Sequence, residues 1–271
     1  MSQYSSIAKA KIKSIADLQQ MKQAGQKISS LTAYDASFSA LLDQAGVDVL
    51  LVGDSLGMVV QGHASTLPVT LQDMIYHTQL VSRARQQAFV IADLPFMSSA
   101  SPMQAAENAA LLIQQGGAQM VKLEGARCAA IEFMVQQAIP VCAHLGLLPQ
   151  SIYQLGKYAV QGKQEDDAAK ILADAIKVEQ AGAQMLVLEC IPAALAQKIS
   201  EQLSIPVIGI GAGVDCDGQV LVLYDMLDIS LGRKPRFSKN YMQQAGSIFE
   251  AVQAYVAEVR EQKFPAQEHS F

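Results

Sequence analysis

Charged and hydrogen-bonding side chains stand at or just after the ends of successive short apolar runs. These residues are Asp54, Ser55, Asp93, Lys122, Glu124, His144 and Glu189. If the runs are parallel strands of a barrel, their carboxyl ends meet at one mouth, where the side chains converge. A single residue of this kind is usually a loop residue or a helix cap. A series of them, in a chain of which only 17% is charged, indicates a functional site.

Carboxylates that face one cavity repel each other unless a cation lies between them. Oxygen ligands without a cluster of histidines and cysteines favour a hard ion, Mg²⁺ before Zn²⁺. Because Mg²⁺ takes only one or two protein carboxylates directly, we expect Asp54 and Asp93 as ligands and Glu124 as the next candidate. Lys122 lies two positions before Glu124, so both side chains point to the same face of one strand. A lysine there would pair with the carboxylate of an anionic substrate.

Two further features leave alternatives open. His144 is either an active-site imidazole or a structural residue whose hydrogen bonds are satisfied inside the protein. The glycines of the segment Gly209–Gly213 lie near the end of the chain, whereas a dinucleotide-binding loop belongs in the first βαβ unit. Instead of a dinucleotide-binding loop, these glycines indicate a close approach of the backbone to a ligand, which we take as the expectation.

The elements that must position the site are short apolar runs alternating with longer helix-like stretches. The runs are Ile28–Ala33, Val49–Val52, Phe89–Ala92, Met120–Leu123, Pro140–Ala143, Met185–Leu188 and Pro206–Ile210. They are too short for helices and mostly apolar throughout, which is typical of strands buried on both faces of a parallel sheet. The helix-like stretches include Ser101–Gln115, Asp166–Gln180 and Ala193–Leu203. We expect the eighth strand at Leu227–Ser230, after a helix-like Gly218–Tyr224.

Internal repeats support this alternation. The segments Gly46–Asp54, Gly117–Glu124 and Gly182–Glu189 share one design, in which a helix-ending glycine precedes an apolar strand that finishes on a carboxylate. The pattern predicts a single (β/α)₈ TIM barrel over residues 1–271, and an open doubly wound sheet is the alternative. We expect an N-terminal helical extension over residues 1–26 and a C-terminal helix and tail over residues 241–271.

Composition narrows the functional classes. The chain has 271 residues, of which 51% are hydrophobic, so it is not disordered. Its net charge of -5 argues against nucleic acid as a partner, because phosphate binding needs a basic face. No stretch approaches the roughly 18 apolar residues of a membrane span, and no signal peptide precedes the chain. The four cysteines form no CxxC pair, and together these observations predict a cytoplasmic protein with no membrane partner.

The candidate residues lie within a series of short motifs. These are Leu51–Met58, Thr66–Thr70, Ala92–Phe96, Val121–Gly125, His144–Leu147, Pro149–Ser151, Val207–Gly213, Asp217–Gln219 and Glu268–Phe271. In this order, from about Thr32 to Phe271, they closely resemble the ketopantoate hydroxymethyltransferase family. The segment Gly156–Val160 departs from the family pattern without touching a candidate residue.

The resemblance implies the transfer of a hydroxymethyl group from 5,10-methylenetetrahydrofolate to 3-methyl-2-oxobutanoate, which gives ketopantoate for pantothenate biosynthesis. It further implies a Mg²⁺-bearing barrel and a homo-oligomer, commonly a decamer. The metal ligands that it implies are Asp54, Asp93 and Glu124. The substrate contacts are Asp54, Ser55, Asp93, Lys122 and His144. Glu189 is the implied catalytic base.

This chemistry also suits the residues themselves. A 2-oxo acid chelates Mg²⁺ through its keto and carboxylate oxygens, which acidifies the neighbouring C3–H for removal by a carboxylate base. The nearest rival is a barrel similar to phosphoenolpyruvate mutase or isocitrate lyase. Such enzymes carry a reactive cysteine in a mobile loop, and no loop of that kind is evident here.

A second alternative is a non-catalytic barrel that binds a metabolite. Such a protein would not explain why the carboxylates gather at strand ends.

Overall fold

Eight parallel strands close into a barrel in the computed structural model, which describes residues 11–232 and 234–271. The strands are β1 (Ile28–Thr32), β2 (Val49–Val52), β3 (Phe89–Asp93), β4 (Met120–Glu124), β5 (Val141–Gly146), β6 (Met185–Glu189), β7 (Val207–Ile210) and β8 (Gly218–Leu221). They pair in chain order, and β8 pairs with β1 to complete the circle. The predicted TIM barrel is therefore confirmed, and the open doubly wound sheet is excluded.

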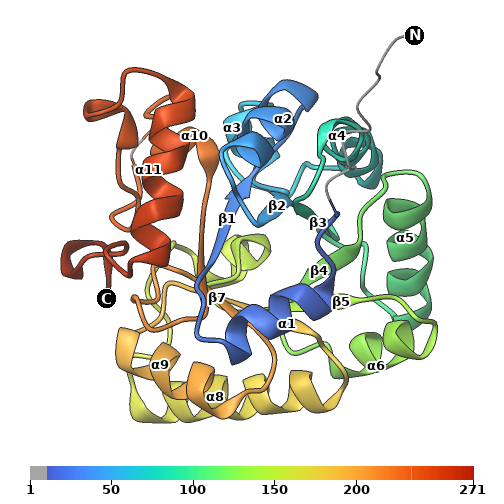
Figure 1. Ribbon diagram of the computed structural model, residues 1–271. Helices are drawn as coiled ribbons and strands as arrows, with labels where there is room; N and C mark the ends of the chain where they lie inside the picture. The colour runs from blue at the N-terminus through green and yellow to red at the C-terminus, as the bar shows by residue number, and fades with distance from the viewer. Residues whose placement is uncertain (1–10, 233) are drawn as a thin grey trace, which may run out of the picture.

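Helices surround the barrel as a ring, and α1 lies across the near end of the barrel in Figure 1. The helices are α1 (Ile15–Gln23), α2 (Ala36–Gln44), α3 (Leu56–Val59), α4 (Leu71–Ala84), α5 (Pro102–Gln114), α6 (Cys128–Gln136), α7 (Ile152–Leu155), α8 (Glu165–Gln180), α9 (Ala193–Gln202), α10 (Leu223–Met226) and α11 (Ile248–Arg260). Short 3₁₀ turns lie at η1 (Pro149–Ser151), η2 (Tyr241–Gln243) and η3 (Gln267–His269). The Ser101 side chain accepts a hydrogen bond from the Gln104 N–H and begins α5, as a cap followed by proline predicts.

Side chains alternate between the inside of the barrel and the layer beneath the helices. The inward-facing apolar residues form one cluster: Ile28, Val49, Leu51, Phe89, Ile91, Met120, Cys142, Met185, Val187, Ile208, Ile210 and Val220. Leu18 of α1 belongs to this cluster and is fully buried. Helix α1 therefore closes the end of the barrel at which the strands begin, and the other end is left for the polar residues.

The eighth strand is Gly218–Leu221, so the predicted strand at Leu227–Ser230 is wrong. Strand β1 approaches Gly218 so closely that a Cβ there would lie 2.3 Å from the Ile28 carbonyl oxygen. The segment after β8 forms the short helix α10, and Asp228 has a left-handed φ of 65° just beyond it. A four-residue strand that begins with glycine and runs almost directly into a helix shows too little strand periodicity to be recognised.

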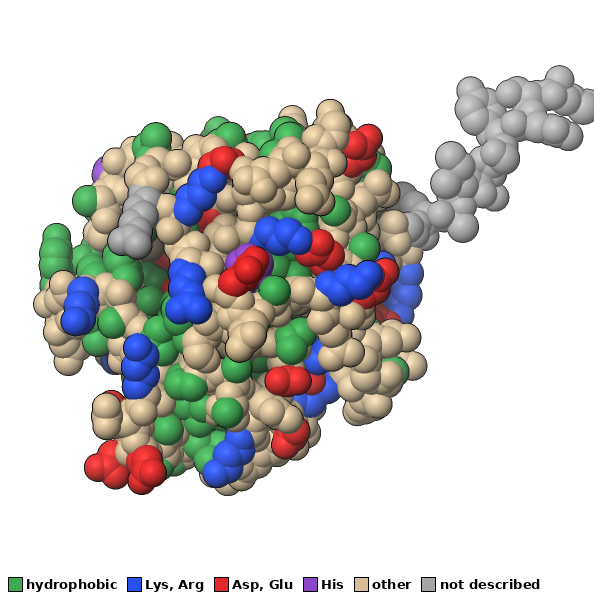
Figure 2. All heavy atoms as spheres, turned by 90° about the vertical axis from the view of Figure 1, so that its left-hand side faces the viewer, with side chains coloured by type: hydrophobic (Ala, Val, Ile, Leu, Met, Phe, Trp, Pro, Cys, Tyr) green, Lys and Arg blue, Asp and Glu red, His purple; other side chains and the backbone are tan. Residues whose placement is uncertain are grey.

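The C-terminal segment stabilises the seam of the barrel, which is the pairing of β1 with β8 that closes it. The Tyr255 hydroxyl of α11 lies 2.9 Å from the Ser30 carbonyl and 2.9 Å from the Gln219 carbonyl. Within the predicted C-terminal helix and tail over residues 241–271, the helix covers only Ile248–Arg260, because a 3₁₀ turn precedes the Ser247 cap of α11. On the side that carries α11, acidic and basic side chains lie interspersed (Figure 2). None of the described helices is both long and apolar enough to cross a bilayer.

Candidate active site

The register of the strands brings the predicted residues together in pairs. Asp93 of β3 lies opposite Lys122 of β4, and Glu124 lies opposite His144 of β5. Lys122 and Glu124 are both buried, at 5% and 8% exposure. The Lys122 ammonium is 2.9 Å from Oδ1 of Asp93. Strand pairing alone therefore accounts for the first contacts of the site.

A row of side chains continues from Lys122 across the mouth of the barrel. Lys122 Nζ is 3.5 Å from Nδ1 of His144, and Nε2 of the same ring is 3.3 Å from Oε2 of Glu189. Glu124 Oε1 lies 3.7 Å from His144 Nδ1. Because an ammonium only donates, Nδ1 must accept, so the neutral imidazole carries its hydrogen on Nε2, which makes no hydrogen bond within the described residues. His144 therefore lies between Lys122, Glu124 and Glu189, within the cluster of predicted site residues.

Asp54 and Ser55 reach the site from the turn after β2. The Asp54 N–H donates to Oδ2 of Asp93 over 3.1 Å. Gly53 makes room for this turn, since a Cβ there would lie 2.8 Å from Oγ of Ser55. Oγ of Ser55 is 2.9 Å from the hydroxyl of the buried Tyr34. All seven predicted residues thus belong to one continuous polar region.

Burial and mutual repulsion set the protonation of this region. Burial, together with the neighbouring Asp93 charge, raises the pKa of Asp54 to about 7. Burial and the Asp54 charge likewise hold the pKa of Glu124 well above its ordinary value. Burial alone would lower the pKa of Lys122, but the surrounding carboxylates raise it above its usual value. The lysine therefore stays charged among acids that only partly ionise near neutrality.

Burial away from water is the main cause of the pKa shifts of His144 and Glu189. Burial and the adjacent Lys122 ammonium keep the pKa of His144 well below its ordinary value, so the ring is neutral. Burial raises the pKa of Glu189 to about 7. A carboxylate with a pKa near the working pH is suited to accept a proton and release it again.

The donor set suits a hard cation that keeps part of its water shell. Oδ1 of Asp93 is buried and makes no hydrogen bond within the described residues, with only the Lys122 ammonium beside it. A cation would supply the missing partner and relieve the repulsion between Asp54 and Asp93. Within residues 11–232 and 234–271, no three His, Cys, Asp or Glu side chains form a ready metal cage. A site that takes two carboxylates and completes its shell with water and substrate needs no such cage.

Two residues of the site were missed in the sequence analysis. Gln150 of η1 donates from Nε2 to Oδ2 of Asp54 over 2.8 Å, and its backbone N–H donates to Oε2 of Glu124 over 3.0 Å. Tyr34, just after β1, contacts Ser55 as described above. Gln150 lay within a recognised motif, Pro149–Ser151, but a loop residue has no periodicity from which its direction could be predicted.

The glycine-rich segment after β7 approaches side chains of the protein itself. Gly211 has a left-handed φ of 59°, and a Cβ there would lie 3.0 Å from the Phe237 ring and 3.1 Å from the Phe271 ring. The Phe271 carbonyl in turn accepts a hydrogen bond from the Ala193 N–H at the start of α9. At Gly211 the backbone therefore packs closely against Phe237 and the C-terminal residue Phe271.

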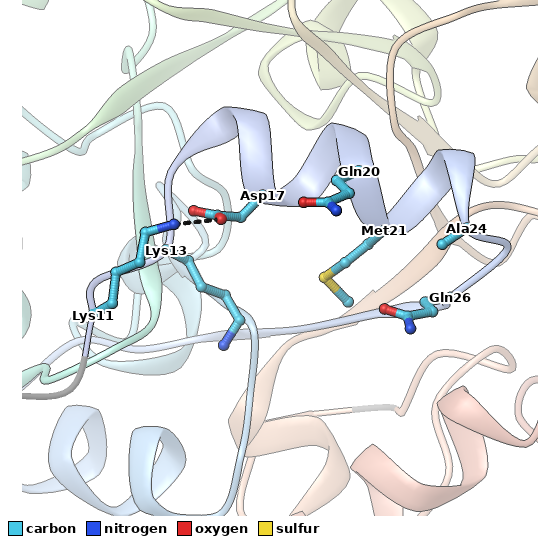
Figure 3. A pocket seen from close by; sticks show the side chains of 7 residues that line it. All are labelled: Lys11, Lys13, Asp17, Gln20, Met21, Ala24 and Gln26. Carbon is cyan, nitrogen blue, oxygen red and sulfur yellow. Dashed lines mark hydrogen bonds and ion pairs between the residues drawn. The ribbon is translucent and has the colours of Figure 1, made fainter.

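A separate hollow lies beside α1, at the opposite end of the barrel from the carboxylates (Figure 3). Its lining residues are Lys11, Lys13, Asp17, Gln20, Met21, Ala24 and Gln26. Lys11 pairs with Asp17 at 2.7 Å, as drawn in Figure 3, and Lys13 lies 3.5 Å from the buried Asp48. The cations of this hollow are thus engaged within the protein, which makes it a poor candidate for the reaction.

Several solved structures share this fold. A phosphonomutase-like protein from Burkholderia cenocepacia J2315 superposes with a TM-score of 0.64 at 19% identity, over 80% of this chain and 95% of the other. Phosphonopyruvate hydrolase in complex with oxalate and Mg²⁺ has a TM-score of 0.59 at 11% identity, over 77% of this chain and 80% of the other. At this identity, the likeness shows a shared fold alone.

Sequence relatives are far closer. A 3-methyl-2-oxobutanoate hydroxymethyltransferase of Nitrosococcus oceani is 57% identical over 256 residues, which cover 94% of this chain and 97% of the relative. One from Alkalilimnicola ehrlichii is 57% identical over 94% of this chain and 92% of the relative. The sequence profile of the ketopantoate hydroxymethyltransferase family matches residues 12–267. The chain is therefore a member of the ketopantoate hydroxymethyltransferase family, as the motifs around its strand ends predicted.

Proposed function

We propose that the protein transfers a hydroxymethyl group from 5,10-methylenetetrahydrofolate to 3-methyl-2-oxobutanoate and so forms ketopantoate. The observation that carries the proposal is the row of contacts from the Asp93–Lys122 pair through neutral His144 to Glu189. It provides a cationic and carboxylate region for the 2-oxo acid group at one end. At the other end it provides a buried carboxyl group that serves as a base.

Asp54 and Asp93 would hold Mg²⁺, with Glu124 as the third carboxylate beside it. When bound, the ion supplies Lewis-acid polarisation of the keto oxygen, which acidifies the C3–H. Lys122 has three donor hydrogens, so it pairs with the substrate carboxylate while it keeps Asp93 oriented. Oγ of Ser55, held by the Tyr34 hydroxyl, adds a hydrogen bond to the same end of the substrate.

Glu189 takes the C3 proton of the keto acid on one of its carboxylate oxygens. The side chain is 16% exposed, which leaves it less enclosed than Asp93 or Lys122 and open to a substrate at the mouth. Nε2 of His144 lies 3.3 Å from Oε2 of Glu189 and makes no hydrogen bond within the described residues, so a turn of either side chain would let it donate to the ionised carboxylate. The carbon nucleophile then attacks the one-carbon unit of the folate. Water supplies the hydroxyl group of the product, and tetrahydrofolate leaves with one proton from that water and the one that Glu189 took.

Two finer points belong to the same proposal. The folate would approach over the open side of the mouth, beside Tyr158. Burial and the nearby charge of Glu189 raise the pKa of this tyrosine.

The protein would assemble as a homo-oligomer, with a decamer expected. Light scattering coupled to size-exclusion chromatography measures that mass directly, and a monomeric mass would contradict the expected assembly.

A product assay tests the activity. The protein is incubated with 3-methyl-2-oxobutanoate, Mg²⁺ and methylenetetrahydrofolate, and ketopantoate is measured by mass spectrometry. An Asp93→Asn variant is the matched control, because it keeps the shape of the side chain and loses the charge that would hold the metal. Product from the wild type alone supports the proposal. Folded wild-type protein that yields none would reject it and favour a reaction of the mutase type instead.

A further inference from the structure

Gln150 connects three strand ends of the site from a loop outside the barrel. It lies in η1, after β5, and its amide nitrogen donates to Oδ2 of Asp54 over 2.8 Å and to the Leu94 carbonyl over 3.0 Å. Its backbone N–H donates to Oε2 of Glu124 over 3.0 Å. One residue thereby contacts carboxylates that follow or end β2 and β4, and the backbone just after β3.

The chemistry of an amide suits this position. Asp54 and Glu124 are almost fully buried, at 4% and 8% exposure, and an unpartnered carboxylate oxygen there is costly. The neutral side-chain amide satisfies one oxygen of Asp54 and the backbone N–H satisfies one oxygen of Glu124, and neither donor cancels the negative charge of its partner when that group is ionised. A lysine or arginine at position 150 would neutralise that charge, and an acid would add repulsion. Both amide hydrogens of Gln150 are used, so its orientation is set.

We propose that Gln150 is a positioning residue that fixes the planes of the Asp54 and Glu124 carboxylates, so that their remaining oxygens serve a divalent cation. The inference rests on the proposed magnesium site and adds to it an outer partner that determines cation affinity. The same contacts tie the segment after β5 to the mouth of the barrel. Outer partners of this kind typically contribute about 10–100-fold to metal affinity.

Mn²⁺ binding without keto acid tests the role directly, because the free ion is counted by its electron paramagnetic resonance signal. Gln150→Met removes both side-chain donors and keeps the length of the side chain. We expect its Mn²⁺ affinity to fall by about 10–100-fold and the line shape of bound Mn²⁺ to change. Gln161→Met is the matched control, since within the described residues the Gln161 side-chain amide donates only to the Ala159 carbonyl, and its affinity should equal that of the wild type.

Each possible result supports or contradicts the positioning role of Gln150. Wild-type affinity in Gln150→Met would overturn the inference and leave the metal site standing. Equal losses in Gln150→Met and Gln161→Met would also overturn it, because the whole loop and not the amide would then matter. No binding by the wild type would reject the proposed metal site together with this role. If Gln150→Met fails to fold, Gln150→Asn, whose amide is one methylene too short to reach Asp54, is judged by the same criteria.

Discussion

Single residues at the mouth depend on one another for their charge. Neutral His144 lies between a permanently charged Lys122 and a Glu189 whose pKa burial raises to about 7. The lysine keeps the imidazole from taking a proton, since two cations in one buried place repel. The only group of this trio that changes charge near neutrality is therefore Glu189, and its protonation should control the rate.

Glu189→Gln should separate binding from proton removal. The amide keeps the volume of the side chain and cannot accept the proton, so exchange of the C3 hydrogen with deuterated water should slow by about 10²–10⁴-fold. Keto acid and Mg²⁺ should still bind, because Asp54, Asp93 and Lys122 are unchanged. Nuclear magnetic resonance follows the exchange without folate. Exchange at the wild-type rate with turnover lost would move Glu189 to the folate side and make His144 the candidate base.

The pH profile should reflect the same group. A base acts when it is ionised, and the Glu189 pKa of about 7 means that the ionised fraction declines as the pH falls through 7. The kcat/KM of the wild type should therefore drop on the acid side, by about tenfold per pH unit well below that pKa. At saturating Mg²⁺, which would keep Asp54 ionised although its pKa without metal is also about 7, this acid limb should be missing from the residual rate of Glu189→Gln. An identical limb in both proteins would assign the titration to another residue.

Lys122 should act mainly on substrate affinity. Lys122→Met keeps the length of the apolar stem and removes the charge that pairs with the substrate carboxylate. Loss of one charged hydrogen bond in a buried site costs about 1.5–3 kcal/mol, which corresponds to a KM raised by roughly 10–150-fold. Steady-state kinetics in keto acid measure the change. An unchanged KM would show that Lys122 serves Asp93 alone.

Among the elements, those with strong periodicity were predicted well and the loops were not. Strands β1 to β7 were recognisable from their apolar runs, and alternation along β4 placed Lys122 and Glu124 on one face. The contact of Asp93 with Lys122 needed only neighbouring strands. Gln150 reaches Asp54 through the course of a turn, which no local pattern reveals. Strand β8 was missed because its glycine start and its proximity to α10 weaken the strand pattern.

The seam between β1 and β8 depends on a helix that follows both strands. Tyr255→Phe removes the hydroxyl that contacts the Ser30 and Gln219 carbonyls and keeps the ring. Two buried carbonyls lose a partner, so the free energy of unfolding should fall by about 1–3 kcal/mol. Urea denaturation followed by circular dichroism measures the loss. The Mn²⁺ affinity of the folded variant should stay unchanged, and a stability equal to that of the wild type would mean that water replaces the hydroxyl.

In the whole molecule, one end of the barrel contributes to stability and the other end carries the candidate active site. The end at which the strands begin is closed by α1 and holds apolar side chains. The end at which they finish holds Lys122, His144 and the buried carboxylates of the candidate active site. Layers of apolar side chains lie between the two ends, so a change at the closed end should affect stability and leave the chemistry intact.

Leu18→Ala tests that division. The side chain is fully buried against the interior cluster, and its truncation should lower the free energy of unfolding by about 2–5 kcal/mol. C3 hydrogen exchange per folded molecule, measured well below the melting temperature, should match the wild type. A variant whose exchange rate fell along with its stability would show that the two ends are mechanically linked.

The order in which the chain leaves the ribosome determines when the barrel can close at the seam between β1 and β8. Strand β1 is made among the first described elements, whereas its partner β8 and the tyrosine of α11 that braces both come near the end. Until then the growing sheet has two open edges, and exposed edges invite pairing with other chains. Closure is thus one late event that joins the beginning of the barrel to its end. A nascent chain released before α11 would carry every residue of the proposed chemistry and still lack the brace across its seam.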